Sequence, residues 1–388
     1  MADKKLVFIH GSDPAHAHTP WMFYHLDPSF YQGTPVQGEG LVFDLVYFDF
    51  EKGTRSTWKN WKTLRSHSAP KDATTVDALT PTVKIRDNKG KEIEGQPEYP
   101  SVIAFYDWVK AQPEKSIASI QIFSHGVTYQ PVLFALSYEW GDNRDKRNDL
   151  TAARDPQDTE FRLRDFEGSN PLGPVDLGAG AGSGLARFKT ALAPDCFIKI
   201  WGCGEQTRTG HGAPIRKLVT KWVNLQDKDD PKGTQRATLL LGYLDFIKSC
   251  FPYRMAEALD MPVWAAPIGW GSDPNELDGE YDPKTYAKEK YNYSGKFPPN
   301  LAKKELWWRV TVNFRIDERV ANKFFNGALG AALDPMSYVE YRKSWVKAAE
   351  DKANQVLPQP TAGPGVMQAP KQLQQALLDR IQQLGLTS

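Results

Sequence analysis

The chain has 388 residues, of which 24% are charged and 40% are apolar, and its 48 basic and 47 acidic residues give a net charge of +1. A dedicated nucleic-acid binder needs a basic excess to neutralise phosphates, so this charge balance excludes that class. No apolar run reaches the roughly 18 residues of a transmembrane helix, so no membrane partner is expected. The 3 cysteines cannot all pair with one another, which argues against a disulfide scaffold and predicts a reducing compartment.

The amino terminus leads at once into the apolar segment Leu6–Ile9. This segment is shorter than the apolar region of a secretory signal peptide, and it predicts a buried strand. The predicted location is therefore the cytoplasm. Export by a signal-independent route, such as bacterial toxins use, stays compatible with the sequence.

Six apolar segments predict strands, and most of them are apolar on both faces. That pattern is typical of a parallel sheet covered by helices. Because helical patterns precede several strands, we expect an α/β fold, a three-layer open sheet of about six mostly parallel strands. The predicted strands are Leu6–His10, Leu41–Phe50, Ile117–His125, Cys196–Cys203, Pro262–Ile268 and Leu306–Ile316, and the predicted helices are Pro100–Ala111, Gly184–Ala193 and Tyr253–Leu259.

The predicted α/β domain covers residues 1–320, with a long polar insert at about 139–184 between the third and fourth strands. Residues 321–356 are expected to form a helical extension. Residues 357–370 are rich in Pro and Gly and predict a linker. Residues 371–388 carry apolar side chains at helical spacing, and this terminal helix could dock on its own domain or tether a protein partner.

Chemistry in open α/β sheets gathers at the carboxyl ends of the strands. The third predicted strand ends in Ser124-His125-Gly126, and the fourth ends in Gly202-Cys203-Gly204. If these strands are neighbours, about 5 Å apart, the His125 imidazole and the Cys203 thiol can meet above the sheet edge. A thiolate is a nucleophile, and a neighbouring imidazole can hold its proton.

The flanking glycines let the backbone turn sharply and let a substrate approach closely. The N–H groups of Gly126 and Cys203 could therefore bind a developing oxyanion. The other two cysteines, Cys196 and Cys250, lie in apolar stretches without such flanking residues, so they are interpreted as packing residues.

These motifs resemble the caspase-like cysteine peptidases, the group that includes caspases, gingipains, clostripain and separase-type domains. In that family a six-stranded, mostly parallel sheet carries the catalytic His after the third strand, in a Ser-His-Gly-like motif, and the catalytic Cys after the fourth. Order, strand position and local glycines agree here over about residues 1–320, although the 78-residue separation of His125 and Cys203 is longer than in a typical caspase. The Gln-Ala-Cys-Arg-Gly form of true caspases is absent, so aspartate specificity is not implied.

The resemblance implies a cysteine endopeptidase that acts on polypeptides without a cofactor or metal. His125 would serve as general base and acid, and Cys203 would form a thioester with the substrate. The segment after the fifth strand would border the substrate cleft, with Trp270 as a flat apolar wall and Glu205 or Asp273 as selectors of a basic side chain, unless these carboxylates belong to an ordinary acidic loop. The substrate-binding residues implied in this way are Glu205, Trp264, Trp270 and Asp273.

Two alternative functions stay open. His10-Gly11 after a strand is similar to the oxyanion loop of α/β-hydrolases, which would make Ser124 the nucleophile of an esterase or lipase. Gly-x-Ser-x-Gly is required there, but its first glycine is missing, and a β-like stretch follows Gly126 where a helix should start. The other alternative is a non-catalytic interaction module of the same fold.

The amino-terminal region is dense enough in histidine for metal binding, with His10, His16, His18 and His25. No second ligand cluster has a recognised spacing, so a polar loop over the sheet edge is preferred.

In many caspase-like enzymes the chain is cut near the Cys strand during activation, and residues 141–184 and Gln226–Gln235 are the candidate segments here.

Overall fold

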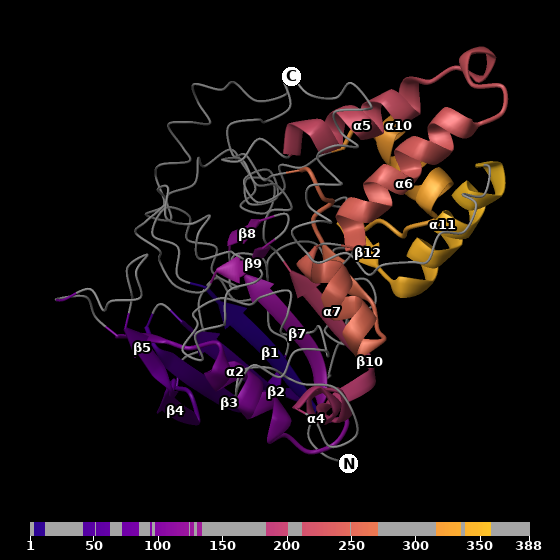
Figure 1. The fold of residues 1–388 in the computed structure, drawn as a ribbon. Coiled ribbons are helices and arrows are strands. Elements are labelled where there is room, and N and C mark those ends of the chain that lie inside the picture. Colours follow the sequence, from indigo (N-terminus) through magenta and orange to yellow (C-terminus); the bar gives the residue numbers. More distant parts are fainter. Residues whose placement is uncertain are drawn as a thin grey trace, which may run out of the picture.

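The fold is taken from a computed structural model, which describes residues 4–11, 42–50, 52–62, 72–84, 94, 98–123, 125–127, 130–133, 184–200, 212–248, 250–270, 316–334 and 338–357. These residues form one mixed sheet of eight strands with helices packed along it (Figure 1). The strand order is β12-β11-β10-β7-β1-β2-β3-β4. The predicted α/β class is therefore confirmed.

The sheet consists of β1 (Lys5–His10), β2 (Val42–Asp49), β3 (Thr54–Lys62), β4 (Thr75–Ala78), β7 (Ile117–Phe123), β10 (Leu192–Ile200), β11 (Val263–Ala265) and β12 (Val339–Tyr341). Two separate hairpins pair β5 (Thr82–Lys84) with β6 (Glu98–Pro100) and β8 (His125–Val127) with β9 (Gln130–Leu133).

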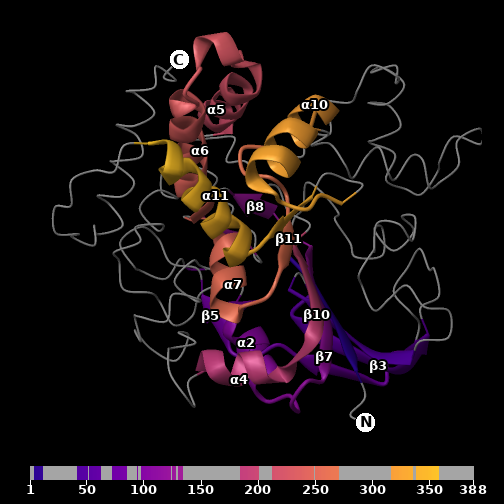
Figure 2. The same cartoon turned by 90° about the vertical axis from the view of Figure 1, so that its right-hand side faces the viewer.

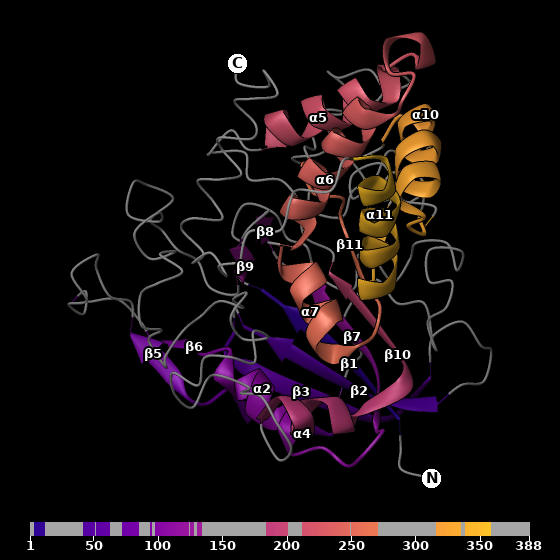
Figure 3. The ribbon, with the colours of Figure 1, turned by 45° about the vertical axis from the view of Figure 1, so that its right-hand side comes forward.

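Parallel pairing is confined to the centre of the sheet. Strands β2, β1, β7, β10 and β11 run parallel (Figure 3), whereas β3, β4 and β12 add antiparallel pairs at the two sides. The expected six mostly parallel strands are thus corrected to a mixed set of eight. Strand β3 is mostly polar, with most of its described side chains half-buried, and β4 is short and exposed at all four positions. Both were missed because the prediction relied on runs that are apolar on both faces. The predicted strand Leu306–Ile316 lies, apart from its last residue, outside the described residues.

The helices are α2 (Ile103–Lys110), α4 (Gly184–Ala191), α5 (Gly212–Asn224), α6 (Thr234–Lys248), α7 (Phe251–Leu259), α10 (Glu318–Val320) and α11 (Lys343–Val356), with a 3-10 turn η4 (Asp227–Asp229) and a π-helix η5 (Ala321–Leu329). Helices α2, α4 and α7, which the sequence predicted, lie on one side of the sheet (Figure 2). Helix α7 has a proline in its first turn, and Asp260, which follows its last residue Leu259, is in the left-handed conformation, two features that define helix ends.

One hydrophobic core joins this side of the sheet to the helices. It contains Ile9 of β1, Ile122 of β7 and Ile200 of β10 together with residues of every long helix. The opposite face buries Phe8 and Phe123, which belong to no part of that core. A second helical layer, as the predicted three-layer sheet requires, is not seen in the described part of the chain.

Residues 321–356, where a helical extension is expected, contain the π-helix η5, the short strand β12 and helix α11. Strand β12 pairs antiparallel with β11, so residues beyond 320 belong to the sheet. Helix α11 packs on α6, where Lys248 and Glu350 form an ion pair. The proposed insert and the segments after Leu357 lie outside the described residues, apart from Gly184 at the start of α4.

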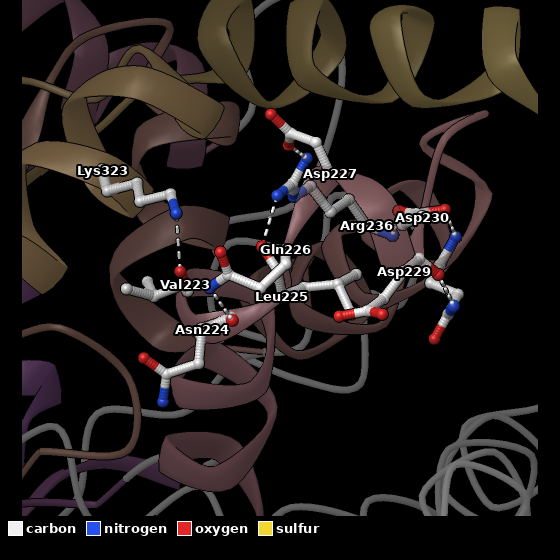
Figure 4. A network of polar contacts seen from close by, with 10 residues as sticks. Val223, Asn224, Leu225, Gln226, Asp227, Asp229, Asp230, Arg236 and Lys323 are labelled. Carbon is white, nitrogen blue, oxygen red and sulfur yellow. Dashed lines mark hydrogen bonds and ion pairs between the residues drawn. The ribbon is translucent and has the colours of Figure 1, made fainter.

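The candidate activation segment Gln226–Gln235 is a tightly bonded turn between α5 and α6 (Figure 4). The Asp230 carboxylate accepts backbone hydrogen bonds from Gln235 (3.1 Å) and Arg236 (2.9 Å). The Arg236 guanidinium donates to Asp227 at 2.7 Å and to the carbonyl of Leu225. Cleavage in this segment would require these bonds to open first.

Candidate active site at the carboxyl edge of the sheet

The strands that lead to His125 and Cys203 are hydrogen-bonded neighbours. Strands β7 and β10 run parallel, with Ile122 opposite Ile200. His125 and Cys203 each follow their register partner by three positions. Because parallel strands lie about 4.8 Å apart, the ends of β7 and β10 lie side by side on the carboxyl edge of the sheet, the side on which β1, β2, β7, β10 and β11 end (Figure 3). Strands β7 and β10 are therefore neighbours, as the sequence argument required.

The predicted site residues differ in how much the structure describes. His125 and Gly126 form the start of β8, with the backbone of His125 opposite Leu133 in β9. The side chain of His125 lies outside the described part of the structure, as do all of Ser124, Cys203, Glu205 and Asp273. The structure thus brings the strand ends together and leaves the contact between the His125 imidazole and the Cys203 thiol as a prediction.

Trp264 and Trp270, the two predicted cleft tryptophans, are described. Trp264 lies within β11, where its ring stacks on Phe197 of β10 with centroids 6.4 Å apart. Trp270 follows β11 and is half-buried, with its ring edge-to-face against Phe325 of η5 at 5.7 Å. Trp270 is therefore at the carboxyl edge, whereas Trp264 lies within the sheet, with β10 between its strand and β7.

A buried polar group at the ends of β1 and β2 was not predicted. His10 and Asp49 are the last residues of these neighbouring strands and are opposite each other, and they are 5% and 3% exposed. The Nδ1 atom of His10 lies 3.0 Å from the hydroxyl of Tyr47 and 3.7 Å from Oδ1 of Asp49. Among the described residues, the Nε2 atom of His10 has no hydrogen-bond partner.

Asp49 is held in its ionised form. Burial would raise the pKa of Asp49, but the nearby His10 ring and the Lys52 backbone N–H, which donates to Oδ1 at 3.0 Å, outweigh burial and lower the pKa. The Lys52 ammonium adds an ion pair at 3.2 Å to Oδ2. A carboxylate that faces an imidazole in this way can orient the ring and stabilise its protonated form.

The His10–Asp49 pair lies beside the candidate site. His10 is opposite Phe123, the last residue of β7, and the N–H of Gly11 donates to the Phe123 carbonyl at 2.8 Å. His125 follows two residues later. The sequence offered one signal, a His at a strand end, but the pairing with Asp49 depends on a strand register that only the structure supplies.

A second buried ion pair lies within β10. The Lys199 ammonium, 1% exposed, donates to Oδ2 of Asp334 at 2.5 Å and lies 4.2 Å from the centre of the Tyr338 ring. Burial lowers the pKa of Lys199, and the Asp334 carboxylate opposes that shift. This pair joins β10 to the segment before β12.

The two described cysteines match their prediction as packing residues. Cys196 in β10 and Cys250 before α7 are free thiols, both buried. Burial raises the pKa of Cys250 to about 12 and that of Cys196 further still, because a thiolate would lose its hydration there. Neither thiol is suited to act as a nucleophile near neutral pH.

In the described ranges, no three His, Cys, Asp or Glu side chains are grouped so that they could hold a metal ion. His16, His18 and His25 lie outside these ranges. None of the helices seen in the described part of the chain combines the length and the apolar character needed to cross a membrane.

Comparison of the chain with protein-family models, with curated proteins and with solved structures finds no match in any of the three.

Proposed function

We propose that this protein is a cysteine peptidase of caspase-like fold that cleaves polypeptides with a Cys203–His125 dyad. The single observation that carries the proposal is the pairing of β7 with β10, in which Ile122 faces Ile200 and the two reactive residues follow at equal offsets. In chain order the parallel strands are β1, β2, β7, β10 and β11, so His125 follows the third and Cys203 the fourth. That order is the one that the caspase-like resemblance implies.

The chemistry follows from the two side chains. His125 accepts the proton of the Cys203 thiol, and the thiolate sulfur attacks the carbonyl carbon of the scissile peptide bond. The backbone N–H groups of Gly126 and Cys203 would stabilise the tetrahedral oxyanion. The intermediate collapses to a thioester as the leaving amine takes the proton from His125. Water then attacks the thioester, His125 accepts its proton, and the acid and the free thiol are released.

The burial of the other two thiols supports Cys203 as the nucleophile. Cys196 and Cys250 are buried with raised pKa values and would stay protonated at neutral pH. Cys203 is the remaining cysteine, and in the sequence it comes three residues after Ile200, the last residue of β10.

Cleavage of an unbiased peptide library, read by mass spectrometry, tests the proposal. Wild-type protein should cleave, Cys203→Ala should abolish cleavage, and the matched control Cys250→Ala should retain it. Residual cleavage by Cys203→Ala would sink the proposal. An equal loss of cleavage in Cys203→Ala and Cys250→Ala, with both variants still folded by circular dichroism, would also contradict the proposal.

A serine hydrolase is the second candidate, and the His10–Asp49 pair is the observation that favours it. A carboxylate-oriented imidazole is the base that a serine nucleophile needs, and Ser124 directly follows Phe123, the register partner of His10. Against it, the residues after Ser124 form the hairpin β8–β9, whereas the nucleophile turn of an α/β-hydrolase leads into a helix.

Reactive probes separate the two candidates. If the protein is a cysteine peptidase, iodoacetamide should inactivate it and a fluorophosphonate should not. If it is a serine hydrolase, the fluorophosphonate should inactivate it and iodoacetamide should not. A protein that reacts with neither probe and cleaves neither peptides nor esters would be a non-catalytic module of this fold.

A further inference from the structure

Trp270 is held in place by an unusual local backbone. The N–H of Trp270 donates to the Pro267 carbonyl at 3.1 Å and closes a tight turn. Gly269 within this turn has φ of +92°, a conformation that a residue with a side chain would adopt only under strain. The turn therefore fixes the direction in which the Gly269 carbonyl and the following Trp270 leave the end of β11.

The Gly269 carbonyl is bound by Arg216 of α5. Nη1 of Arg216 donates to this oxygen at 2.5 Å, and Arg216 is half-buried. A hydrogen bond from a charged donor is stronger than a neutral one, and a partly buried site shields it from water. Helix α5 is the first described element after Cys203 and begins at Gly212. This bond therefore joins the crossover that carries the proposed nucleophile to the loop that carries Trp270.

The ring of Trp270 packs against the π-helix η5. Phe325 packs edge-to-face against it, and Phe324 and Phe325 are both fully buried against Tyr243 of α6. π-Helical turns are rare and are often found at functional sites. Trp270 stays partly exposed while its neighbours Ala266 and Ile268 are buried. The arrangement leaves one accessible aromatic surface on a rigid base at the carboxyl edge.

We propose that Arg216 is a positioning residue that holds Trp270 as one wall of a subsite for a bulky apolar side chain of the peptide substrate. The inference rests on the proposed peptidase function and adds to it a substrate preference and the residue that enforces it. Arg216 acts through the Gly269 carbonyl and does not touch the substrate. An aromatic wall gains most from apolar side chains, because the gain grows with the apolar surface removed from water.

The test compares two peptides that differ only at the preferred bulky position, which the wild-type cleavage profile identifies. One peptide carries Leu or Phe there, and the other carries Ala. For the bulky peptide, Arg216→Met should raise KM about tenfold or more with little change in kcat, the scale set by a lost charged hydrogen bond. The Ala peptide should be cleaved nearly as before, and Arg216→Lys, which keeps a charged donor, should recover part of the selectivity.

Two further variants make the test decisive. Arg319→Met is the matched control, since exposed Arg319 donates to Asn224 at the other end of α5 at 2.9 Å, and it should leave both peptides unaffected. Trp270→Ala should lose the same selectivity as Arg216→Met, and the double variant should lose no more than either. Selectivity that survives in Arg216→Met, or losses that add in the double variant, would overturn the positioning role.

Failure of the inference and failure of the peptidase proposal give different results. If Cys203→Ala abolishes cleavage while Arg216→Met keeps its selectivity, the peptidase stands and the role of Arg216 is wrong. If Cys203→Ala still cleaves, or the wild type cleaves nothing, the peptidase proposal fails and the subsite fails with it. Hydrogen exchange at residues 266–270 checks that Arg216→Met is folded and loosens only this turn.

Discussion

Both flanks of strand β7 bury a basic side chain beside a carboxylate, and the two pairs differ in place and in bonding. On the β1–β2 flank, His10 and Asp49 are the last residues of their strands and lie 3.7 Å apart. On the β10 flank, Lys199 lies inside its strand and is bonded to Asp334 at 2.5 Å. The first pair is at the carboxyl edge of the sheet, where catalytic residues gather in open α/β folds. The second joins distant chain segments, so we expect it to act on stability.

The largest expected effect separates the two histidines at the edge. His125→Asn should lower kcat/KM about a thousandfold, within the range for loss of a general base. His10→Asn should lower it less than about tenfold, because His10 is the last residue of β1, one strand further from β10 than β7 is. Peptide-cleavage kinetics measure both. A larger loss of kcat/KM in His10→Asn than in His125→Asn would indicate that His10 is the general base and would favour the serine hydrolase.

The second effect concerns the Lys199–Asp334 pair. Asp334→Asn should lower the free energy of unfolding by about 3–5 kcal/mol, because it removes the carboxylate that is bonded to the buried Lys199 ammonium. The loss should shrink as pH rises, since a neutral amine needs no partner. Urea unfolding measures it. The double variant Lys199→Met with Asp334→Leu should recover most of the loss, and no recovery would show that the pair does more than balance charge.

Asp49→Asn should have a smaller effect that depends on pH. At neutral pH it should cost about 1.5–3 kcal/mol, the value of hydrogen bonds to a charged group. The folded-state pKa of Asp49 is lowered, so its contribution is fully present above the unfolded-state value of 3.8 and is lost as pH falls through the folded-state pKa. Unfolding curves of the wild type and Asp49→Asn should therefore converge below about pH 4. A constant gap at acid pH would contradict the assignment.

The smallest predicted effect lies in the α5–α6 turn on the β10 flank. Arg236→Met removes the bonds to Asp227 and Leu225 and should raise the rate of limited proteolysis at residues 226–235 about fivefold, on the order of 1 kcal/mol. Exposed Lys228 offers the control Lys228→Met, which should cleave at the wild-type rate. Rapid cleavage of the wild type at residues 226–235 would instead favour this turn as an activation site.

The sequence predicted the elements whose signals are local. The run in β7 is apolar enough to be buried at every position, and the approximate places of β1, β2, β10, β11, α2, α4 and α7 followed from similar patterns. Helix α5 was missed although its buried residues Ile215, Leu218, Val219 and Val223 have helical spacing, so a systematic count of periodicity would have found it. Strand β12 is only three residues long and carries too little pattern to be recognised.

The parts that could not be predicted depend on contacts between distant residues. Asp49 is 39 positions from His10, and Asp334 is 135 positions from Lys199. Nothing in a linear pattern specifies which strands become neighbours or in which register. The neighbouring positions of β7 and β10 were required by the sequence argument and are supplied by the structure. The link from Arg216 to Gly269 is likewise visible only once α5 and the end of β11 are placed.

The central claim is that Cys203 is a reactive thiol at the carboxyl edge while the other two cysteines are inert. Its most direct test is iodoacetamide labelling of the native protein at neutral pH, with each modified cysteine mapped by mass spectrometry. We expect Cys203 to be modified first, with a rate that falls in His125→Asn. Cys196 and Cys250, buried with raised pKa values, should be modified only after unfolding. Labelling of Cys203 no faster than the buried pair, or at a rate indifferent to His125, would contradict the account.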